Sequence, residues 1–151
     1  MTARETDGRD SLRDEDPPSE VHDAPWVRAL RIGPMKDNER SGKWLLFVSN
    51  DDVDEVWNRI KAATETSRLG CEAKAATAAN QDARGKHVIC VYTPDWQNQD
   101  DVRRVLRELR HMGFTGRLSY KRDSDTLAGV YGSGAAIYVS QPESVEIELR
   151  G

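Results

Sequence analysis

Two segments with helical periodicity constrain the fold of this chain most strongly. Each has apolar residues three and four positions apart, so that one face of a helix is apolar. The apolar residues are Val53, Val56, Trp57, Ile60 and Ala63 in the first segment and Val102, Val105, Leu106, Leu109 and Met112 in the second. Capping residues precede both segments and Gly113 follows the second. We therefore predict helices over about 53–66 and 100–112.

Six runs of residues typical of strands surround these two segments. They are 43–49, 70–78, 87–93, 118–122, 136–140 and 145–149. The third run is almost continuously apolar, as in a central strand, whereas the last alternates apolar and acidic side chains. The order of strand, helix, two strands, helix and three strands predicts an α+β domain with a mainly antiparallel sheet and its helices on one face. The opposite face is then open to a ligand.

The first 24 residues differ in composition from the rest. They hold eight acidic residues against three arginines and few aliphatic side chains. Such a segment buries too little surface to offset the entropy lost when it becomes ordered. We therefore predict a disordered acidic tail over 1–24 and a single domain over 25–151. The tail is either a solubility extension or an acidic mimic that folds back over a basic binding face.

Several classes of protein are excluded by what the sequence lacks. No apolar run approaches the roughly 18 residues of a membrane span, and the charged N-terminus has no signal-peptide core. We therefore expect a cytoplasmic protein without a membrane partner. The cysteines, Cys71 and Cys90, and the three histidines lack the spacing of metal ligands, so we expect no metal. Neither Gly129–Gly134 nor Gly85-Lys86 fits a nucleotide-binding glycine motif, and we expect no cofactor.

Three cations on the predicted strands are candidate ligand-binding residues. Lys74 has small neighbours that leave it accessible on a sheet face, where it either pairs with an acid or binds a phosphate or carboxylate. Lys121 and Arg122 precede the glycine-bearing loop. They are either an anion clamp or edge-strand charges that block aggregation.

Aromatic residues and one helix face add further candidates. Trp26 and Trp96 flank turns and are candidate stacking platforms, whereas the other two tryptophans are expected in the core. The outer face of the second predicted helix is basic. It carries Arg103, Arg104, Arg107, Arg110 and His111. This face is either solvated or a contact for a nucleic acid or an acidic protein.

The order of several motifs resembles that of the cap-binding translation initiation factor. Gly42–Phe47 and Val53–Ile60 are similar to its opening tryptophan strand and its first helix. His87–Thr93, the helix over 100–112 and the segment from Leu118 follow in the order of that fold. Tyr92 stands where that fold has a tryptophan near its ligand.

A closer resemblance is to the basophilic-leukaemia-expressed protein family, whose function is uncharacterised and whose fold is initiation-factor-like. It rests on Arg68–Thr77, on Tyr92–Trp96, and on Tyr120-Lys121 leading to Gly129–Tyr131, and it covers about 40–140. The resemblance implies a curved, mainly antiparallel sheet with two main helices on its convex face. It also implies a ligand site on the concave face.

These observations together predict a non-enzymatic binding module for a phosphate-bearing ligand, a nucleotide or an RNA end, on the concave face. The expected ligand-binding residues are Lys74, Tyr92, Trp96, Tyr120, Lys121, Arg122 and Tyr131. Members of the family are also described as phosphothreonine lyases, for which Lys74 would be the base, His87 the acid, and Lys121 with Arg122 the phosphate ligands. A third interpretation is a protein-interaction scaffold that uses the outer faces of the helices.

Overall fold

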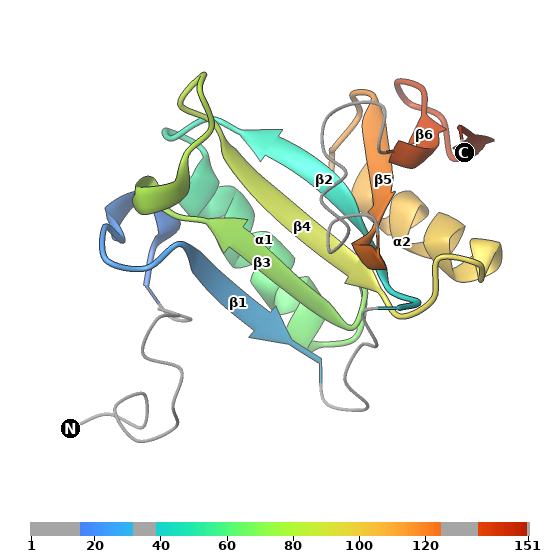
Figure 1. The fold of residues 1–151 in the computed structure, drawn as a ribbon, viewed down its shortest axis with the longest axis horizontal. Helices are drawn as coiled ribbons and strands as arrows, with labels where there is room; N and C mark the ends of the chain where they lie inside the picture. Colours follow the sequence, from blue (N-terminus) through green and yellow to red (C-terminus); the bar gives the residue numbers. More distant parts are fainter. Residues whose placement is uncertain (1–15, 32–38, 125–135, 151) are drawn as a thin grey trace.

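The computed structural model describes residues 16–31, 39–124 and 136–150. Within these residues, seven strands form one sheet and two helices pack against it (Figure 1). The elements are η2 (Pro18–Glu20), β1 (Trp26–Leu30), β2 (Gly42–Val48), α1 (Val53–Glu65), β3 (Glu72–Ala76), η3 (Ala78–Asn80), β4 (His87–Thr93), α2 (Gln99–His111), β5 (Leu118–Arg122), β6 (Ala136–Ser140) and β7 (Glu148–Leu149).

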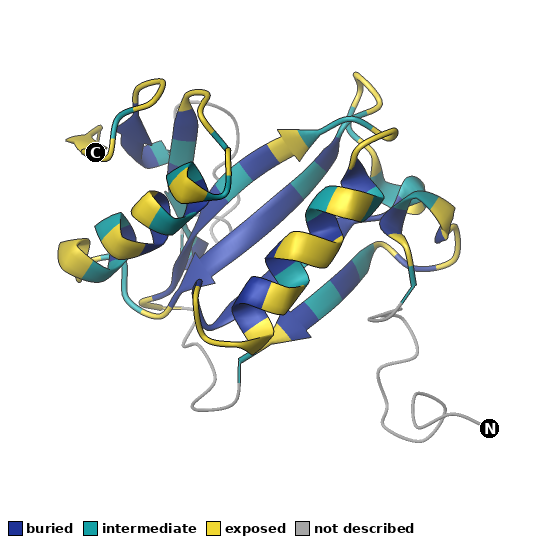
Figure 2. Ribbon diagram, turned by 180° about the vertical axis from the view of Figure 1, so that it is seen from behind, coloured by how far each residue is buried: buried dark blue, intermediate teal, exposed yellow. Residues whose placement is uncertain are grey.

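The sheet has the strand order β1-β3-β4-β2-β5-β6-β7, and every neighbouring pair is antiparallel. Both helices lie on the convex face and turn their exposed residues away from the sheet (Figure 2). The prediction of an α+β fold with a curved, mainly antiparallel sheet and two helices on its convex face is therefore confirmed.

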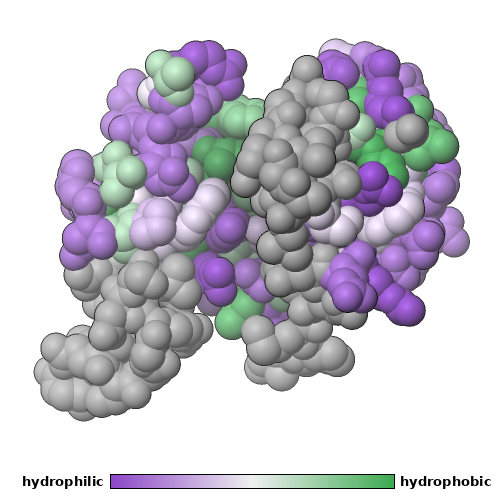
Figure 3. Space-filling model, in the orientation of Figure 1, coloured by the Kyte–Doolittle hydropathy of each residue, from purple (hydrophilic) through white to green (hydrophobic). Residues whose placement is uncertain are grey.

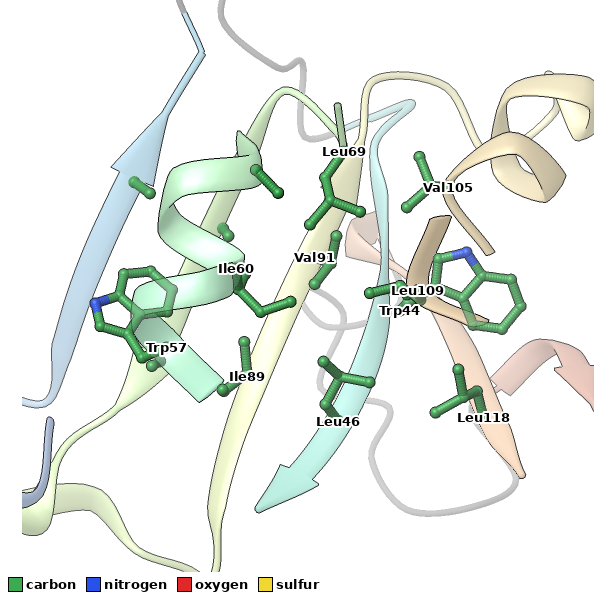
Figure 4. Packing of buried hydrophobic residues seen from close by; sticks show 14 of the residues in the cluster. Trp44, Leu46, Trp57, Ile60, Leu69, Ile89, Val91, Val105, Leu109 and Leu118 are labelled. Atoms are coloured by element: carbon green, nitrogen blue, oxygen red, sulfur yellow. The ribbon is translucent and has the colours of Figure 1, made fainter. Parts of the chain in front are cut away.

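The hydrophobic core lies between the helices and the sheet (Figure 4). Trp57 and Ile60 of α1 are almost fully buried, as are Val105 and Leu109 of α2. On the sheet side, the indole Nε1 of Trp44 donates a hydrogen bond to the backbone oxygen of Val102, 3.2 Å away, which ties β2 to α2. The apolar stripes of the two predicted helices therefore mark the residues that form the core.

Two strands differ from the sequence-based expectation. β1, at one edge of the sheet, was not among the predicted strands, because apolar and polar residues do not alternate clearly in its sequence WVRAL. Its extended conformation depends instead on antiparallel pairing with β3. β7 at the other edge keeps only Glu148–Leu149 of the predicted run 145–149, and both residues are exposed. The side chains of an exposed strand bury little surface, so little free energy is available to extend β7 beyond two residues.

The domain boundary also needs correction. Pro18 is buried, and Val21 and Ala24 keep only 4% and 2% of their surface exposed, so residues 16–24 belong to the domain rather than to a disordered tail. Ser19 binds α1, since its backbone N–H and its Oγ donate to the two carboxylate oxygens of Asp54 at 2.9 and 2.5 Å. A few well-placed contacts thus order a segment of polar composition. The remainder of the expected tail, 1–15, lies outside the described residues.

Among the described residues, neither helix has the length and apolar character needed to cross a membrane.

Candidate ligand-binding site on the concave face

Strand register gathers polar residues on the concave face, opposite the helices. One row across the sheet runs from Arg28 through Lys74, Cys90 and Leu45 to Ser119, on five successive strands. Their neighbours along each strand point to the other face, because side chains alternate in a strand. The same alternation places Ala73, Ala75 and Val91 in the core.

A second row lies two residues along the strands. It joins Glu72 of β3, Tyr92 of β4, Lys43 of β2 and Lys121 of β5. Glu72 is 4% exposed and lies 3.8 Å from the Nε of Arg28. The concave face therefore carries cations at several places, with acidic partners for some of them.

A cavity of about 600 Å³ lies on this face. Its lining combines lysines, aromatic rings, apolar floor residues and a polar rim. The lining residues are Trp26, Lys43, Leu45, Phe47, Lys74, Asn80, Gln81, Asp82, Val88, Cys90, Ser119, Lys121 and Ala136. In Figure 3, which shows this side of the molecule, hydrophobic surface lies among hydrophilic side chains. A cavity of this size and mixed character is typical of sites for small molecules.

Lys43 is held by a buried ion pair at one end of the cavity. Its Nζ lies 2.6 Å from the Oδ1 of Asp123, and the two residues are 7% and 5% exposed. Ser41 donates its hydroxyl to the other carboxylate oxygen of Asp123, and the backbone N–H of Asp123 donates to the oxygen of Ser41 at 3.0 Å. The charge of Lys43 is thus balanced by a carboxylate, and this network fixes the end of β5 to the start of β2.

A cationic side chain packs against each of the two aromatic rings that line the described part of the cavity. The Nζ of Lys74 lies 3.9 Å from the centroid of the Trp26 ring. The guanidinium of Arg84 lies 5.5 Å from the centroid of the Phe47 ring, which belongs to a residue that is 51% exposed. Both distances lie within the range of favourable cation–π contacts.

A tight turn between η3 and β4 forms the polar rim of the cavity. Oδ1 of Asp82 accepts hydrogen bonds from the backbone N–H groups of Arg84 and Lys86, both at 2.9 Å. Oδ2 accepts a further bond at 3.0 Å from the guanidinium of Arg84. The hydrogen bond from Lys86 is the main reason why the pKa of Asp82 lies below its usual value. Gly85 has a φ of 77°, which a glycine adopts without strain. This turn holds the rim residues in fixed positions.

Two titratable residues of β4 on the concave face, Cys90 and Tyr92, are uncharged at neutral pH. Burial raises the pKa of the Cys90 thiol, and burial likewise raises the pKa of the Tyr92 hydroxyl. Cys90 therefore stays a thiol, although it lines the cavity beside lysines. The cavity thus combines ammonium groups with a neutral thiol and apolar side chains, and the carboxylate of Asp82 lies at its rim.

The structure brings together some of the residues predicted for the site. Lys74 and Lys121 both line the cavity. Tyr92 lies on the same face, 3% exposed, with the Nζ of Lys43 at 5.6 Å from its ring centroid. Trp96 and Arg122 are not among the lining residues and instead contact each other, with the guanidinium 5.0 Å from the ring centroid.

Tyr120 lies on the opposite face of the sheet from the cavity. It is fully buried on the helix side, where its ring packs against Trp44 and its hydroxyl is 2.5 Å from the Oγ1 of Thr93. The expectation that Tyr120 binds the ligand is therefore corrected: it alternates with Lys121, and only one of the two can face the cavity. Tyr131, the last predicted ligand residue, lies outside the described residues.

The arrangement required for the lyase alternative is not present. His87 is fully buried on the helix side, with its Nδ1 2.6 Å from the backbone oxygen of Ala76 and its Nε2 2.9 Å from the Oδ1 of Asn50. Lys74 lies on the cavity side of the sheet. His87 therefore cannot deliver a proton to a leaving group that Lys74 contacts, and this assignment is corrected. Both ring nitrogens of His87 instead stabilise the start of β4.

The sequence-based prediction missed Lys43 and Phe47 on β2, Cys90 on β4 and the rim over 80–82. Alternation along β2 could have shown that Lys43 and Phe47 share one face, opposite Trp44. Only the tertiary structure brings the rim over this face. Among the described residues, no group of three or more His, Cys, Asp or Glu side chains is placed to hold a metal ion.

Comparison with solved structures shows where this fold occurs elsewhere. The Schistosoma initiation factor eIF4E, solved with m7GpppA and 4E-BP, superposes with a TM-score of 0.51 at 17% identity, over 68% of this chain and 60% of that one. C. elegans eIF4E-3, solved with the 4E-binding protein Mextli and a cap analog, gives 0.47 at 25% identity, over 64% and 60% of the chains. Ascaris suum eIF4E-3, solved with an m2,2,7G cap, gives 0.44 at 19% identity, over 60% and 57%. The chain thus matches about 60% of the length of these structures, and the first of them shows that it has an initiation-factor-like fold.

The family is shown by a comparison with sequence models of protein families. Residues 35–127, more than half of the chain, match the family described as basophilic leukemia-expressed protein Bles03. The matched segment contains all elements from β2 to β5 and includes the three lysines of the cavity. The family suggested by the motifs is therefore confirmed, and the protein belongs to the Bles03 family.

Proposed function

We propose that this protein is a non-enzymatic binding module that holds a nucleotide, or the phosphorylated end of an RNA, in the concave-face cavity. The observation that carries this proposal is the joint presence of Lys74, Lys121, Trp26 and Phe47 in one cavity of about 600 Å³. Ammonium groups bind phosphate through charge-assisted hydrogen bonds, and aromatic rings stack on bases.

The dimensions of the cavity suit an elongated ligand. Lys43 and Phe47 are four residues apart on β2, so the lysine end and the aromatic end are separated by about 13 Å along the strand. Lys121 is the register partner of Lys43, which places two lysines at the same end. A base at the aromatic end and phosphates towards Lys121 would therefore occupy both halves of the cavity.

The proposal favours binding over catalysis because of the groups that the cavity lacks among the described residues. Burial raises the pKa values of Cys90 and Tyr92, which makes both of them weak proton donors, and His87 faces the other side of the sheet. A lyase needs a general acid beside its lysine base. Electrostatic attraction and stacking need no such group.

The similarity to solved structures suggests which nucleotide to use as a probe in a binding experiment. The Schistosoma initiation factor with the same fold was solved with m7GpppA. A capped dinucleotide therefore belongs beside ATP and GTP in any binding experiment. The sandwich of two aromatic rings that a methylated guanine needs would have to use Trp26 and Phe47, the aromatic residues that line the cavity in the described part of the chain, although β3 and β4 lie between their strands.

The test is a calorimetric titration of the protein with ATP, GTP and m7GpppA at low and high salt. We expect binding to at least one nucleotide, with an affinity that falls as the salt concentration rises, because lysines meet phosphates. Lys121→Ala should weaken binding, whereas Arg107→Ala, which changes an exposed residue on the helix side, should leave it unchanged. Absence of binding to all three nucleotides would refute the proposal.

A phosphothreonine peptide, incubated with the same protein, tests the lyase alternative. We expect neither release of phosphate nor the loss of mass that accompanies dehydration of the residue. Detection of both products would replace the binding proposal by a catalytic one.

A further inference from the structure

The contact between Lys74 and Trp26 lies inside the proposed binding cavity. Both residues line it, and the Nζ of Lys74 is 3.9 Å from the centroid of the indole. Lys74 pairs in register with Arg28, two residues along β1 from Trp26, so lysine and tryptophan are diagonal neighbours on the same sheet face. The contact thus follows directly from the pairing of β1 with β3.

The strand order shows the direction from which the ammonium approaches the indole. β1 is the edge strand, and β3 lies between β1 and the rest of the sheet. Lys74 therefore approaches Trp26 from the centre of the sheet, where the cavity lies. A planar ring that stacks on Trp26 from within the cavity has to take the place of this ammonium.

Displacement of Lys74 has a cost that depends on the ligand. The ammonium loses a cation–π contact when a ring takes its place. Its four-carbon stem lets it move to a new partner within the same cavity. A phosphate on the ligand provides that partner, because it accepts charge-assisted hydrogen bonds from an ammonium. A nucleoside with the same base but without phosphate does not.

We propose that Lys74 is a specificity-determining residue that makes the cavity select phosphorylated ligands over unphosphorylated ligands with the same base. In the ligand-free protein it occupies the stacking face of Trp26, and in the complex it lies on the phosphate. The proposal rests on the proposed function, since it concerns the same cavity.

The test compares a nucleoside with its triphosphate, adenosine with ATP and guanosine with GTP, on the full-length protein. Lys74→Ala should weaken binding of the triphosphate but strengthen binding of the nucleoside, by about two- to fivefold, as expected for the loss of a competing cation–π contact. Lys74→Met keeps an apolar side chain of similar length and should behave in the same way. Agreement of the two variants shows that the effect does not come from a local distortion of β3 in Lys74→Ala. The thermal midpoint of each variant checks that it is folded.

Lys121→Ala is the matched control. It removes one positive charge from the same cavity but leaves the pair of Lys74 and Trp26 in place. It should weaken triphosphate binding without strengthening nucleoside binding. In the double variant Trp26→Leu with Lys74→Ala, the gain in nucleoside affinity should disappear, because the uncovered indole is gone.

The outcomes separate this inference from the proposed function. If the wild-type protein binds a triphosphate and both Lys74 variants weaken nucleoside and triphosphate alike, or affect neither, the role of Lys74 is refuted while the binding function stands. If the wild-type protein binds neither ATP nor GTP, the role of Lys74 is refuted, and the binding function fails as well if m7GpppA does not bind either. Opposite changes for the two ligands, found in the Lys74 variants and not in Lys121→Ala, establish the inference.

Discussion

Arg110, one of the basic residues on the outer face of α2, has a structural role. Its Nε donates to Ser144, one terminal nitrogen donates to Phe114 and Gly116, and the other donates to Ser140 and Gln141. Four of these acceptors are backbone oxygens, and that of Ser144 also accepts a hydrogen bond from the Oγ of Ser140 at 3.0 Å. The planar guanidinium therefore ties the end of α2 to the chain before β5 and after β6.

Arg110→Ala should lower the free energy of unfolding by roughly 2–3 kcal/mol, because several backbone acceptors lose a charged donor. Arg110→Lys should recover only part of this loss, since an ammonium cannot reproduce the forked geometry. Arg107→Ala on the same helix changes an exposed residue and should stay within about 0.5 kcal/mol. Urea unfolding of the three variants measures these differences. Equal effects of Arg110→Ala and Arg107→Ala would show that the contacts of Arg110 do not stabilise the fold.

At the scale of elements, β4 combines an apolar core face with titratable groups on its concave face. Burial raises the pKa values of Cys90 and Tyr92 above their ordinary values. The unfolded chain therefore loses these protons at a lower pH than the folded protein. Their contribution to stability is complete below the ordinary thiol pKa of about 8.5 and is lost as the pH rises past it and past the phenol value of about 10.

The free energy of unfolding should accordingly be flat around neutral pH and fall between about pH 8.5 and 10.5. Tyr120, whose pKa burial also raises, adds to this fall. The double variant Cys90→Ala with Tyr92→Phe should lose less stability over the same range, because two of the titrating groups are absent. Denaturant unfolding at a series of pH values provides the measurement. A pH profile of the double variant parallel to that of the wild type would mean that neither group titrates differently in the folded state.

Sequence patterns predicted most of the elements but fewer of the site residues. The helices could be predicted because stripes such as those containing Trp57 and Leu109 repeat over several turns. Small neighbours on an alternating strand indicate that Lys74 is accessible, and the position of Lys121 before the glycine-bearing loop makes it a candidate anion ligand. Alternation along β5 shows that Tyr120 and Lys121 face opposite sides of the sheet, so only one of these two neighbours can be a ligand-binding residue. The rim over 80–82 could not be predicted, since its distance from β2 is set by how two strands pair and by how the intervening turn folds.

At the scale of the whole molecule, the segment 16–25 connects α1 with the rim of the cavity. Beyond the bonds of Ser19 to Asp54, Val21 accepts a hydrogen bond from the N–H of Ala79 at 3.3 Å. Pro25 accepts one from the side-chain nitrogen of Asn80, also at 3.3 Å, and Asn80 lines the cavity. Trp26 follows directly in β1. One short segment thus supports both the core and two of the residues that would contact the ligand.

Removal of this segment should therefore affect stability and binding together. Val21 contributes about 1.5–3 kcal/mol by burial, and the hydrogen bonds to Asp54 contribute a similar amount. In a protein of this size the melting temperature changes by about 2–4 °C for each kcal/mol of stability. The variant that lacks 1–24 should therefore melt roughly 10 °C below the variant that lacks 1–15. Asp54→Asn in the full-length chain should give a smaller decrease in the same direction, because the amide is a weaker acceptor for Ser19. Equal melting temperatures of the two deletions would show that the contacts of 16–24 do not stabilise the domain. A fall in nucleotide affinity with deletion of 1–24, and not with deletion of 1–15, would link this segment to the binding face through Asn80 and Trp26.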